Sequence, residues 1–266
     1  MLTTQSMFDR YQEVRSRFPK VGACPDTLDI LSLLEITKDI DTFVFDTFRV
    51  LNVGDIMIPG ADRRLNQLRE RGCAIRVLTN AASYDRSSAI AKFKRLGFAL
   101  ADDEIITSRE AVLPFLPSGH WSVIAADVDP LTDLAVTTTR LLDSAIDYET
   151  VDQFLFLSTA AWTHHRQNLL VTAMQRFPRI LLIGNADLAA PRDGGFSVEP
   201  GHWGHLIADM FPDHVRFSGK PFPEVYDLVE TSLSNIPVNR IAMCGDTLHT
   251  DILGAAARDG AMPKSW

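Results

Sequence analysis

The stretch FVFDTFRVLNVG, residues 43–54, decides the fold of this chain. Three apolar residues lead into Asp46, and turn-forming residues follow it. A second acidic segment, GDTLHTD at residues 245–251, likewise follows an apolar strand pattern. Ligands of open α/β sheets gather at the carboxyl ends of the strands. Asp46 and Asp246 can therefore hold one divalent cation, and oxygen ligands without a Cys or His cluster favour magnesium over zinc.

Two segments between these carboxylates carry groups suited to phosphate. Thr79 and Asn80 follow an apolar strand pattern, and Lys220 lies between Gly219 and Pro221 ahead of a helical pattern. These residues supply a hydroxyl, an amide and an ammonium, which all donate hydrogen bonds. The order along the chain is therefore a nucleophile, phosphate anchors and a metal site.

Strands and helices alternate from residue 41 onward. Apolar strands at 43–46 and 74–79 are each followed by a helical pattern, at 61–71 and 85–96, that ends at a glycine. A further strand is expected at 104–107. This alternation predicts an α/β fold with a parallel sheet and helices on both faces.

A second alternating block begins after the turn-rich residues 117–119. We expect it to form an inserted α/β cap domain over residues 117–195, with residues 1–116 and 196–266 forming the core domain. The core should resume with a helix near 201–211 and a strand at 215–218. The elements expected in the cap are strands at 123–126, 154–157 and 180–184 and helices at 133–142 and 163–176.

Residues 1–40 lead into the first strand. Leu28, Leu31 and Leu34 recur at threefold spacing, which predicts a short amphipathic helix that packs on the core.

The composition is that of an ordinary globular protein with a net negative charge. The formal net charge of −8 and the lack of a Lys or Arg run argue against nucleic-acid binding. No apolar run approaches a membrane span, and the start of the sequence shows no signal peptide. Three scattered cysteines, Cys24, Cys73 and Cys244, form no CxxC pair, which favours a reducing, cytoplasmic location.

At these motifs the sequence resembles the haloacid dehalogenase (HAD) superfamily. The similarity is to class IIA, the NagD-like, nitrophenylphosphatase-like and pyridoxal-phosphatase-like hydrolases, and it covers roughly residues 41–260. The family motifs are matched in order by Asp46, Thr79, Lys220 and the pair Asp246 and Asp251. The resemblance implies a Rossmann-like core with an inserted cap.

The resemblance also implies roles for individual residues. Asp46 would be the nucleophile and a magnesium ligand, together with the backbone carbonyl of Phe48 and the carboxylate of Asp246. Asp251 would support the metal through a water molecule or by orienting its loop. Thr79, the backbone amides of Asn80 and Ala81, and Lys220 would bind the phosphoryl group. In the cap, Asn185 and Asp187 resemble a segment that contacts substrate, and relatives often dimerise through the cap.

One departure from the family pattern concerns proton transfer. Family phosphatases carry a second Asp two residues after the nucleophile, where this chain has Phe48, and commonly a Gly next, where it has Arg49. A phenyl ring neither donates nor accepts a proton. A positioned acid/base group contributes about 10²- to 10⁴-fold in rate, so reduced activity is expected.

Three functions follow from this pattern. The leading hypothesis is a magnesium-dependent phosphatase of a small phosphorylated metabolite that works through an aspartyl-phosphate. An alternative is a catalytically silent protein that binds phosphorylated ligands or serves in assembly. A third is a dehalogenase, since family dehalogenases carry an aromatic residue at the position of Phe48, but they lack the Gly245-Asp246-Thr247 motif present here.

Overall fold

The computed structural model describes residues 3–22, 28–192 and 195–258. The chain divides into two compact units. The core unit comprises the described parts of residues 18–79, 86–107 and 220 onward, and the inserted unit comprises those of residues 1–17, 80–85 and 108–219. Each unit is built around its own parallel sheet.

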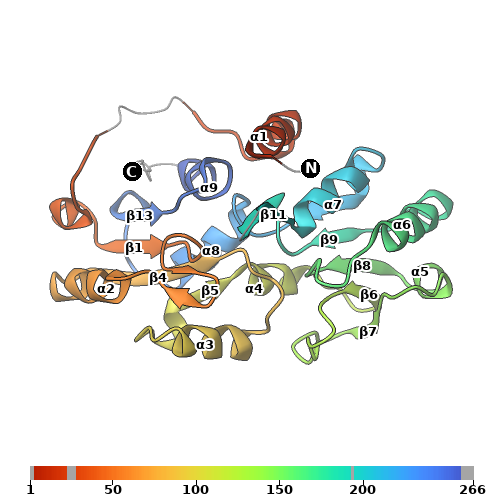
Figure 1. Ribbon diagram of the computed structural model, residues 1–266, viewed down its shortest axis with the longest axis horizontal. Helices are drawn as coiled ribbons and strands as arrows, with labels where there is room; N and C mark the ends of the chain where they lie inside the picture. The colour runs from red at the N-terminus through yellow and green to blue at the C-terminus, as the bar shows by residue number, and fades with distance from the viewer. Residues whose placement is uncertain (1–2, 23–27, 193–194, 259–266) are drawn as a thin grey trace. The chain divides into compact units, whose positions relative to one another are not determined.

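The sheet of the core unit has the strand order β13-β1-β4-β5, and all its pairings are parallel (Figure 1). Its strands are β1 (Thr42–Phe45), β4 (Ala74–Thr79), β5 (Ile105–Thr107) and β13 (Ile241–Cys244). Phe45 at the end of β1 is in register with Cys244 and Val77. The residues that follow β1 and β13 therefore leave the sheet at the same edge.

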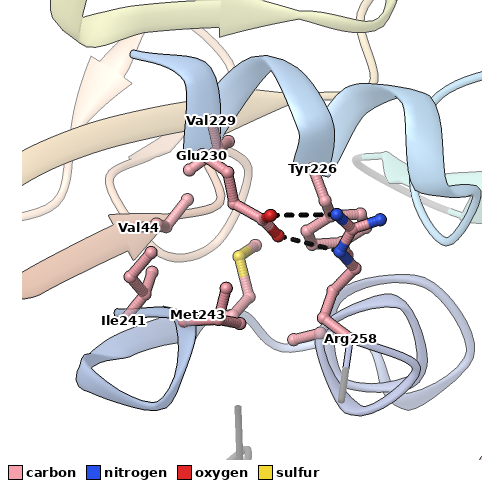
Figure 2. Close-up of a pocket in the computed structure, with 9 residues that line it drawn as sticks. Val44, Tyr226, Val229, Glu230, Ile241, Met243 and Arg258 are labelled. Atoms are coloured by element: carbon pink, nitrogen blue, oxygen red, sulfur yellow. Dashed lines mark hydrogen bonds and ion pairs between the residues drawn. The ribbon is translucent and has the colours of Figure 1, made fainter. Parts of the chain in front are cut away.

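Alternate residues of β1 face two different layers of helices. Phe43 and Phe45 belong to the main apolar cluster, together with residues of α2 (Ala61–Glu70) and α3 (Arg86–Arg95). On the other face, Val44, Ile241 and Met243 line a small apolar pocket beside α8 (Pro223–Thr231), as Figure 2 shows. The helices expected at 61–71 and 85–96 are confirmed by α2 and α3. Both helices have buried apolar residues on one face and end shortly before a glycine with positive φ.

Short elements complete the core unit. A two-stranded hairpin of β2 (Asn52–Val53) and β3 (Ile56–Met57) follows the turn after Asp46. The segment after β13 contains a π-helix, η7 (Leu248–Ile252), that runs into α9 (Leu253–Ala256). The 3-10 helices of this unit are η2 (Leu33–Ile36), η3 (Asp102–Glu104) and η6 (Val238–Arg240).

The helix expected around Leu28, Leu31 and Leu34 is wrong. Leu28 is 53% exposed and Leu31 is fully exposed, and the short helix η2 begins after Ser32. The Ser32 hydroxyl accepts the amide of Leu34 and a hydrogen bond from Arg64. The helix thus begins after Ser32, which caps it, so Leu28 and Leu31 precede the helix. Their threefold spacing does not form a buried helical face.

The inserted unit contains a five-stranded parallel sheet in the order β12-β9-β8-β6-β7 (Figure 1). Its strands are β6 (His120–Ile124), β7 (Thr137–Arg140), β8 (Gln153–Phe156), β9 (Leu181–Ile183) and β12 (Val215–Phe217), and a hairpin joins β10 (Ala189–Arg192) to β11 (Gly195–Val198). Its helices are α1 (Thr4–Glu13), η1 (Arg15–Arg17), α4 (Ser108–Val112), η4 (Leu113–Phe115), α5 (Ile146–Glu149), α6 (His164–Arg176), α7 (Pro200–Ala208) and η5 (Pro212–His214).

The structure places the end of the inserted unit later than the expected residue 195. Strand β12 pairs with β9, and α7 lies so close to β9 that a Cβ at Gly204 would come within 2.7 Å of Ile183. Residues 191, 192 and 195 belong to the antiparallel pair of β10 and β11, and residues 193 and 194 lie outside the described residues. Residues on both sides of the expected boundary therefore pair within the inserted unit, and the chain returns to the core unit only at Lys220.

Two further expectations for the inserted unit differ from the structure. The helix expected at 133–142 is wrong, because this segment contains strand β7, whose run of three threonines favours extended backbone. Helix α1 belongs to the inserted unit and not to the core: the Leu188 amide donates to the Tyr11 hydroxyl, and Arg10 donates to Asp209. Among the described residues, no helix combines the length and the apolar character needed to cross a membrane.

Candidate active site

Three carboxylates gather at the carboxyl edge of the core sheet. Oxygen atoms of Asp46, Asp246 and Asp251 all lie within 4.8 Å of one another. Asp46 directly follows β1, and its amide donates to Cys244 O at 2.8 Å. Asp246 follows β13. The π-helix η7 then turns the chain back toward the sheet edge, so that Asp251 also lies in the cluster. The fold thus assembles a cluster of oxygen ligands from segments about 200 residues apart.

Glycine at position 245 permits this geometry. A Cβ at Gly245 would overlap the side chain of Asp251. The Asp251 carboxylate accepts the Thr247 amide at 3.1 Å, so the loop closes on its own acidic side chain. A residue with a side chain at 245 would displace Asp251 from the cluster.

Lys220 is buried between two of the carboxylates. Its Nζ donates to Asp46 Oδ1 at 2.5 Å, to Asp251 Oδ1 at 2.7 Å and to the carbonyl of Leu78 at 3.3 Å. These donations use the three hydrogens of an ammonium. One cation among three carboxylates leaves negative charge that a further cation would balance.

Burial raises the pKa of Asp46 to about 6, with the neighbouring charge of Asp251 acting in the same direction. The ammonium of Lys220 and the backbone amide of Thr47 oppose this rise in pKa. Charged carboxylates in such a site are stabilised by a bound metal ion. The three oxygen ligands suit magnesium, which prefers hard oxygen donors.

Two buried hydroxyls lie beside this cluster. The Thr47 hydroxyl donates to Thr79 Oγ1 at 3.2 Å, and both residues are less than a tenth exposed. The register of β1 with β4 places the two threonines at neighbouring strand ends. No local sequence pattern marks Thr47, because its contact with Thr79 depends on a strand register that the sequence does not reveal.

Tyr226 of α8 contacts the backbone of the π-helix η7. Its hydroxyl lies 3.2 Å from the carbonyl of Thr250 and 3.1 Å from that of Asp251 and donates to this pair. A Cβ at Gly254 would overlap the Tyr226 ring. No local sequence pattern marks Tyr226 either, because its close approach to Gly254 is visible only in three dimensions.

The residues that depart from the family pattern form a tight turn. Phe48 is half-buried and forms a bridge with Asn52, and the amide of Arg49 donates to Asn52 O at 2.7 Å. Arg49 is exposed and has φ of +64°, in the left-handed region that favours glycine. The turn conformation is therefore one that glycine adopts without strain.

The remaining predicted site residues belong to the inserted unit. Asn80 Nδ2 donates to Asp187 Oδ1 at 2.8 Å, and Asn185 Oδ1 accepts the Asp187 amide at 2.9 Å. Asn185 also donates to Glu199 at 3.4 Å, a carboxyl whose pKa is raised by burial. Asn80, Asn185 and Asp187 thus form one connected polar group. Ala81, which follows Asn80, is half-buried in the same unit.

The pocket in Figure 2 is a different feature of the core unit. It is lined mainly by apolar side chains, and its acidic residue, Glu230, is paired with Arg258 at 2.8 Å. This pairing leaves no clustered ligands for a metal there. The candidate active site is therefore the acidic edge and not this pocket.

Comparison with known proteins places the chain in a family. The family model for haloacid dehalogenase-like hydrolases matches residues 43–128. Glycerol-3-phosphate phosphatase of Homo sapiens is 42% identical over 245 residues, covering 82% of this chain and 76% of that protein. The same alignment shares of 82% and 76% hold for the glycerol-3-phosphate phosphatase of Mus musculus, at 26% identity.

Solved structures share the fold. The 4-nitrophenylphosphatase of Thermotoga maritima superposes with a TM-score of 0.67 at 21% identity, covering 84% of each chain. A glycerol phosphate phosphatase of Mycobacterium tuberculosis, solved in complex with magnesium, superposes with a TM-score of 0.66 at 18% identity, over 84% of this chain and 66% of that one.

This chain belongs to the haloacid dehalogenase-like hydrolases of class IIA. It is a hydrolase of the phosphatase branch of that family.

Proposed function

We propose that this protein is a magnesium-dependent phosphatase of a small phosphorylated metabolite and that it works through an aspartyl-phosphate on Asp46. The observation that carries the proposal is the cluster of Asp46, Asp246 and Asp251, two of which, Asp46 and Asp251, are paired with the ammonium of Lys220. A nucleophile, a cation site and a buried positive charge are the parts that phosphoryl transfer needs.

The first step would be attack on phosphorus by a carboxylate oxygen of Asp46. The bond from phosphorus to the leaving oxygen breaks, and the leaving group takes a proton from water. Lys220 and the Thr79 hydroxyl would stabilise the charge on the transferring group, with the amides of Asn80 and Ala81 as further donors. Water then attacks phosphorus, the bond from phosphorus to the Asp46 oxygen breaks, and the proton lost by the attacking water replaces the one that the leaving group took. Inorganic phosphate leaves and the Asp46 carboxylate is restored.

The magnesium ion would be held by Asp46, Asp246 and the backbone carbonyl of Phe48, with Asp251 as a supporting group. When bound, it would neutralise charge on the phosphoryl oxygens. Every residue type has a backbone carbonyl, so the substitution by phenylalanine does not remove this proposed ligand. The solved relative in complex with magnesium supports the choice of metal.

The side chain of Phe48 determines which substrates would react well. No proton donor stands at that position, so substrates with leaving groups that need little protonation should react fastest. The curated relatives named glycerol-3-phosphate phosphatase support a small phosphate monoester as substrate. Asn185 and Asp187 are the proposed substrate contacts of the inserted unit, which would act as the cap. A cytoplasmic location and a homodimer formed through the cap remain part of this proposal.

The test is hydrolysis of 4-nitrophenyl phosphate and of glycerol 3-phosphate, with and without magnesium. We expect magnesium-dependent release of 4-nitrophenol by the wild-type protein and none by Asp46→Asn, which keeps the size of the side chain but removes its charge. Binding of inorganic phosphate without turnover by the folded, magnesium-loaded protein would instead support a silent binding protein. Halide release from a haloacid would support a dehalogenase.

A further inference from the structure

The buried hydrogen bond between Thr47 and Thr79 is a feature of the core unit that the proposed chemistry does not use. The two Oγ1 atoms are 3.2 Å apart, and Thr47 and Thr79 are 6% and 7% exposed. Thr47 directly follows the nucleophile Asp46, and Thr79 ends the neighbouring strand β4. The bond therefore joins the segment that carries the nucleophile to the residue proposed to anchor phosphate.

The backbone around Thr47 holds its side chain in a defined place. The Thr47 carbonyl accepts the amides of Leu51 at 2.8 Å and Asn52 at 3.0 Å, which closes the turn after Asp46. On the other side, Thr79 is fixed by parallel pairing of β4 with β5, where it is in register with Thr107. Both partners are thus anchored by main-chain hydrogen bonds, so the hydroxyl contact is set by the sheet.

A hydroxyl has a single hydrogen and two lone pairs. When Thr47 donates to Thr79, the hydrogen of Thr79 must point away from Thr47. Because the Thr79 oxygen accepts this bond, the Thr79 hydroxyl can adopt only those rotations that direct its hydrogen away from Thr47. A donor oriented in advance loses less entropy when it binds an anion than one that must first be oriented.

We propose that Thr47 is a positioning residue that orients the Thr79 hydroxyl for donation to a phosphoryl oxygen of the substrate. This inference rests on the proposed phosphatase function for its substrate class. It is independent of whether turnover is fast, because the orientation acts on binding of the phosphate group itself.

The test is a double-mutant cycle of Thr47→Val and Thr79→Val, read by calorimetric binding of inorganic phosphate in the presence of magnesium. Valine has the shape of threonine without the hydroxyl. The matched control is Thr42→Val in the same strand β1, because Thr42 is fully buried and its hydroxyl has no hydrogen-bond partner among the described residues. Thr47→Ser keeps the donor and should retain the wild-type affinity.

We expect Thr47→Val to raise the Kd for phosphate about 3- to 10-fold, the range of one ordinary hydrogen bond. Thr42→Val should leave the Kd unchanged. In the Thr79→Val background, the added Thr47→Val change should have no further effect, because the hydroxyl that it orients is absent. A purely structural role would lower the melting temperature of Thr47→Val and leave the Kd unchanged, which would overturn the proposal. Equal effects of Thr47→Val in both backgrounds would also overturn it.

The same samples separate this inference from the phosphatase function. If the wild-type protein binds phosphate and shows the coupling but does not turn over 4-nitrophenyl phosphate, the inference stands and the catalytic proposal fails. If it turns over substrate without coupling between the two threonines, the reverse holds. If it neither binds phosphate nor turns over substrate, both are wrong.

Discussion

At the scale of single residues, the site combines sequence features that are visible in advance with contacts that are not. Asp46 and Asp246 were predicted as metal ligands because each follows an apolar strand, and the structure brings their oxygens within 4.8 Å of each other and of Asp251. The bond from Lys220 to Asp251 and that from Thr47 to Thr79 depend on loop closure and strand register. Such contacts form between residues far apart in sequence, so no local pattern specifies them.

Phe48 carries the first prediction at this scale. Replacing Phe48 by Asp, together with Arg49→Gly, should raise turnover of alkyl phosphates by about 10²-fold or more and that of aryl phosphates much less. Alkyl leaving groups need protonation in the transition state and aryl groups do so far less. The arginine is changed as well because its charge would lower the pKa of the new carboxyl. Steady-state kinetics with both substrate classes measures the effect, and equal gains on both would contradict a proton-transfer role.

Gly245 carries the second prediction. A Cβ at this position would overlap the Asp251 side chain, so Gly245→Ala should lower the free energy of unfolding by about 1–3 kcal/mol. It should also weaken the rise in melting temperature produced by magnesium, since Asp251 would move out of the cluster. The control is Gly22→Ala, where a Cβ would meet nothing within 4 Å. An unchanged magnesium response in Gly245→Ala would show that Asp251 does not contribute to metal binding.

At the scale of elements, the sequence predicted those whose pattern is local and missed those set by packing partners. Helix α2 was predicted because its apolar face and terminal glycine are both visible in the sequence. The segment at 133–142 was predicted as a helix but contains strand β7, whose residues are paired with β6. Strand β12 was assigned to the core, but it pairs with β9 in the inserted unit. Strand partners are a property of the whole sheet, so a run of three apolar or β-branched residues does not identify them.

The π-helix η7 is the element that most directly shapes the site, and its anchor is Tyr226. Tyr226→Phe should lower the free energy of unfolding by about 1 kcal/mol, the value of one buried hydrogen bond. It should also reduce the magnesium-induced rise in melting temperature, because η7 carries Asp251. The control is Tyr148→Phe, which removes a similar phenol-to-carbonyl bond, to Leu142 at 2.7 Å, in the inserted unit. That variant should lose stability but keep its magnesium response, and equal magnesium responses in the two variants would contradict the anchoring role.

At the scale of the whole molecule, the chain crosses between its two units several times, and each unit has a separate apolar core. The sequence predicted an insertion but placed its end between the paired strands β10 and β11, because Pro- and Gly-rich sequence is typical both of linkers and of connections between strands. It also gave no sign that α1 packs in the inserted unit through Tyr11 and Arg10. Three of the four tryptophans, Trp121, Trp162 and Trp203, lie in that unit, and Trp266 lies outside the described residues. In a Trp266→Phe background, tryptophan fluorescence therefore reports on the unfolding of the inserted unit.

We expect the stability of the inserted unit to depend on pH through His205. It is fully buried in α7, its ring stacks on Phe217 at 4.1 Å between centroids, and its Nδ1 lies 3.2 Å from a guanidinium nitrogen of Arg17. Arginine only donates, so Nδ1 accepts and the ring is neutral. Burial, followed by the charges of Arg17 and Arg10, lowers the pKa of His205 to about 3, although Asp209 acts in the opposite direction.

The folded state therefore resists protonation of His205, whereas the unfolded state takes up a proton near pH 6.5. Stability from this group is present above pH 6.5 and is lost as the pH falls toward 3, at a rate of up to about 1.4 kcal/mol per pH unit. Urea unfolding of the Trp266→Phe protein, followed by tryptophan fluorescence at pH 7.5, 6 and 5, should show this slope. His205→Gln should be less stable at pH 7.5, because the ring stack is lost, but its stability should fall less steeply with pH. Exposed His165→Gln is the matched control, and a slope in His205→Gln equal to that of the control would show that another group governs the acid sensitivity.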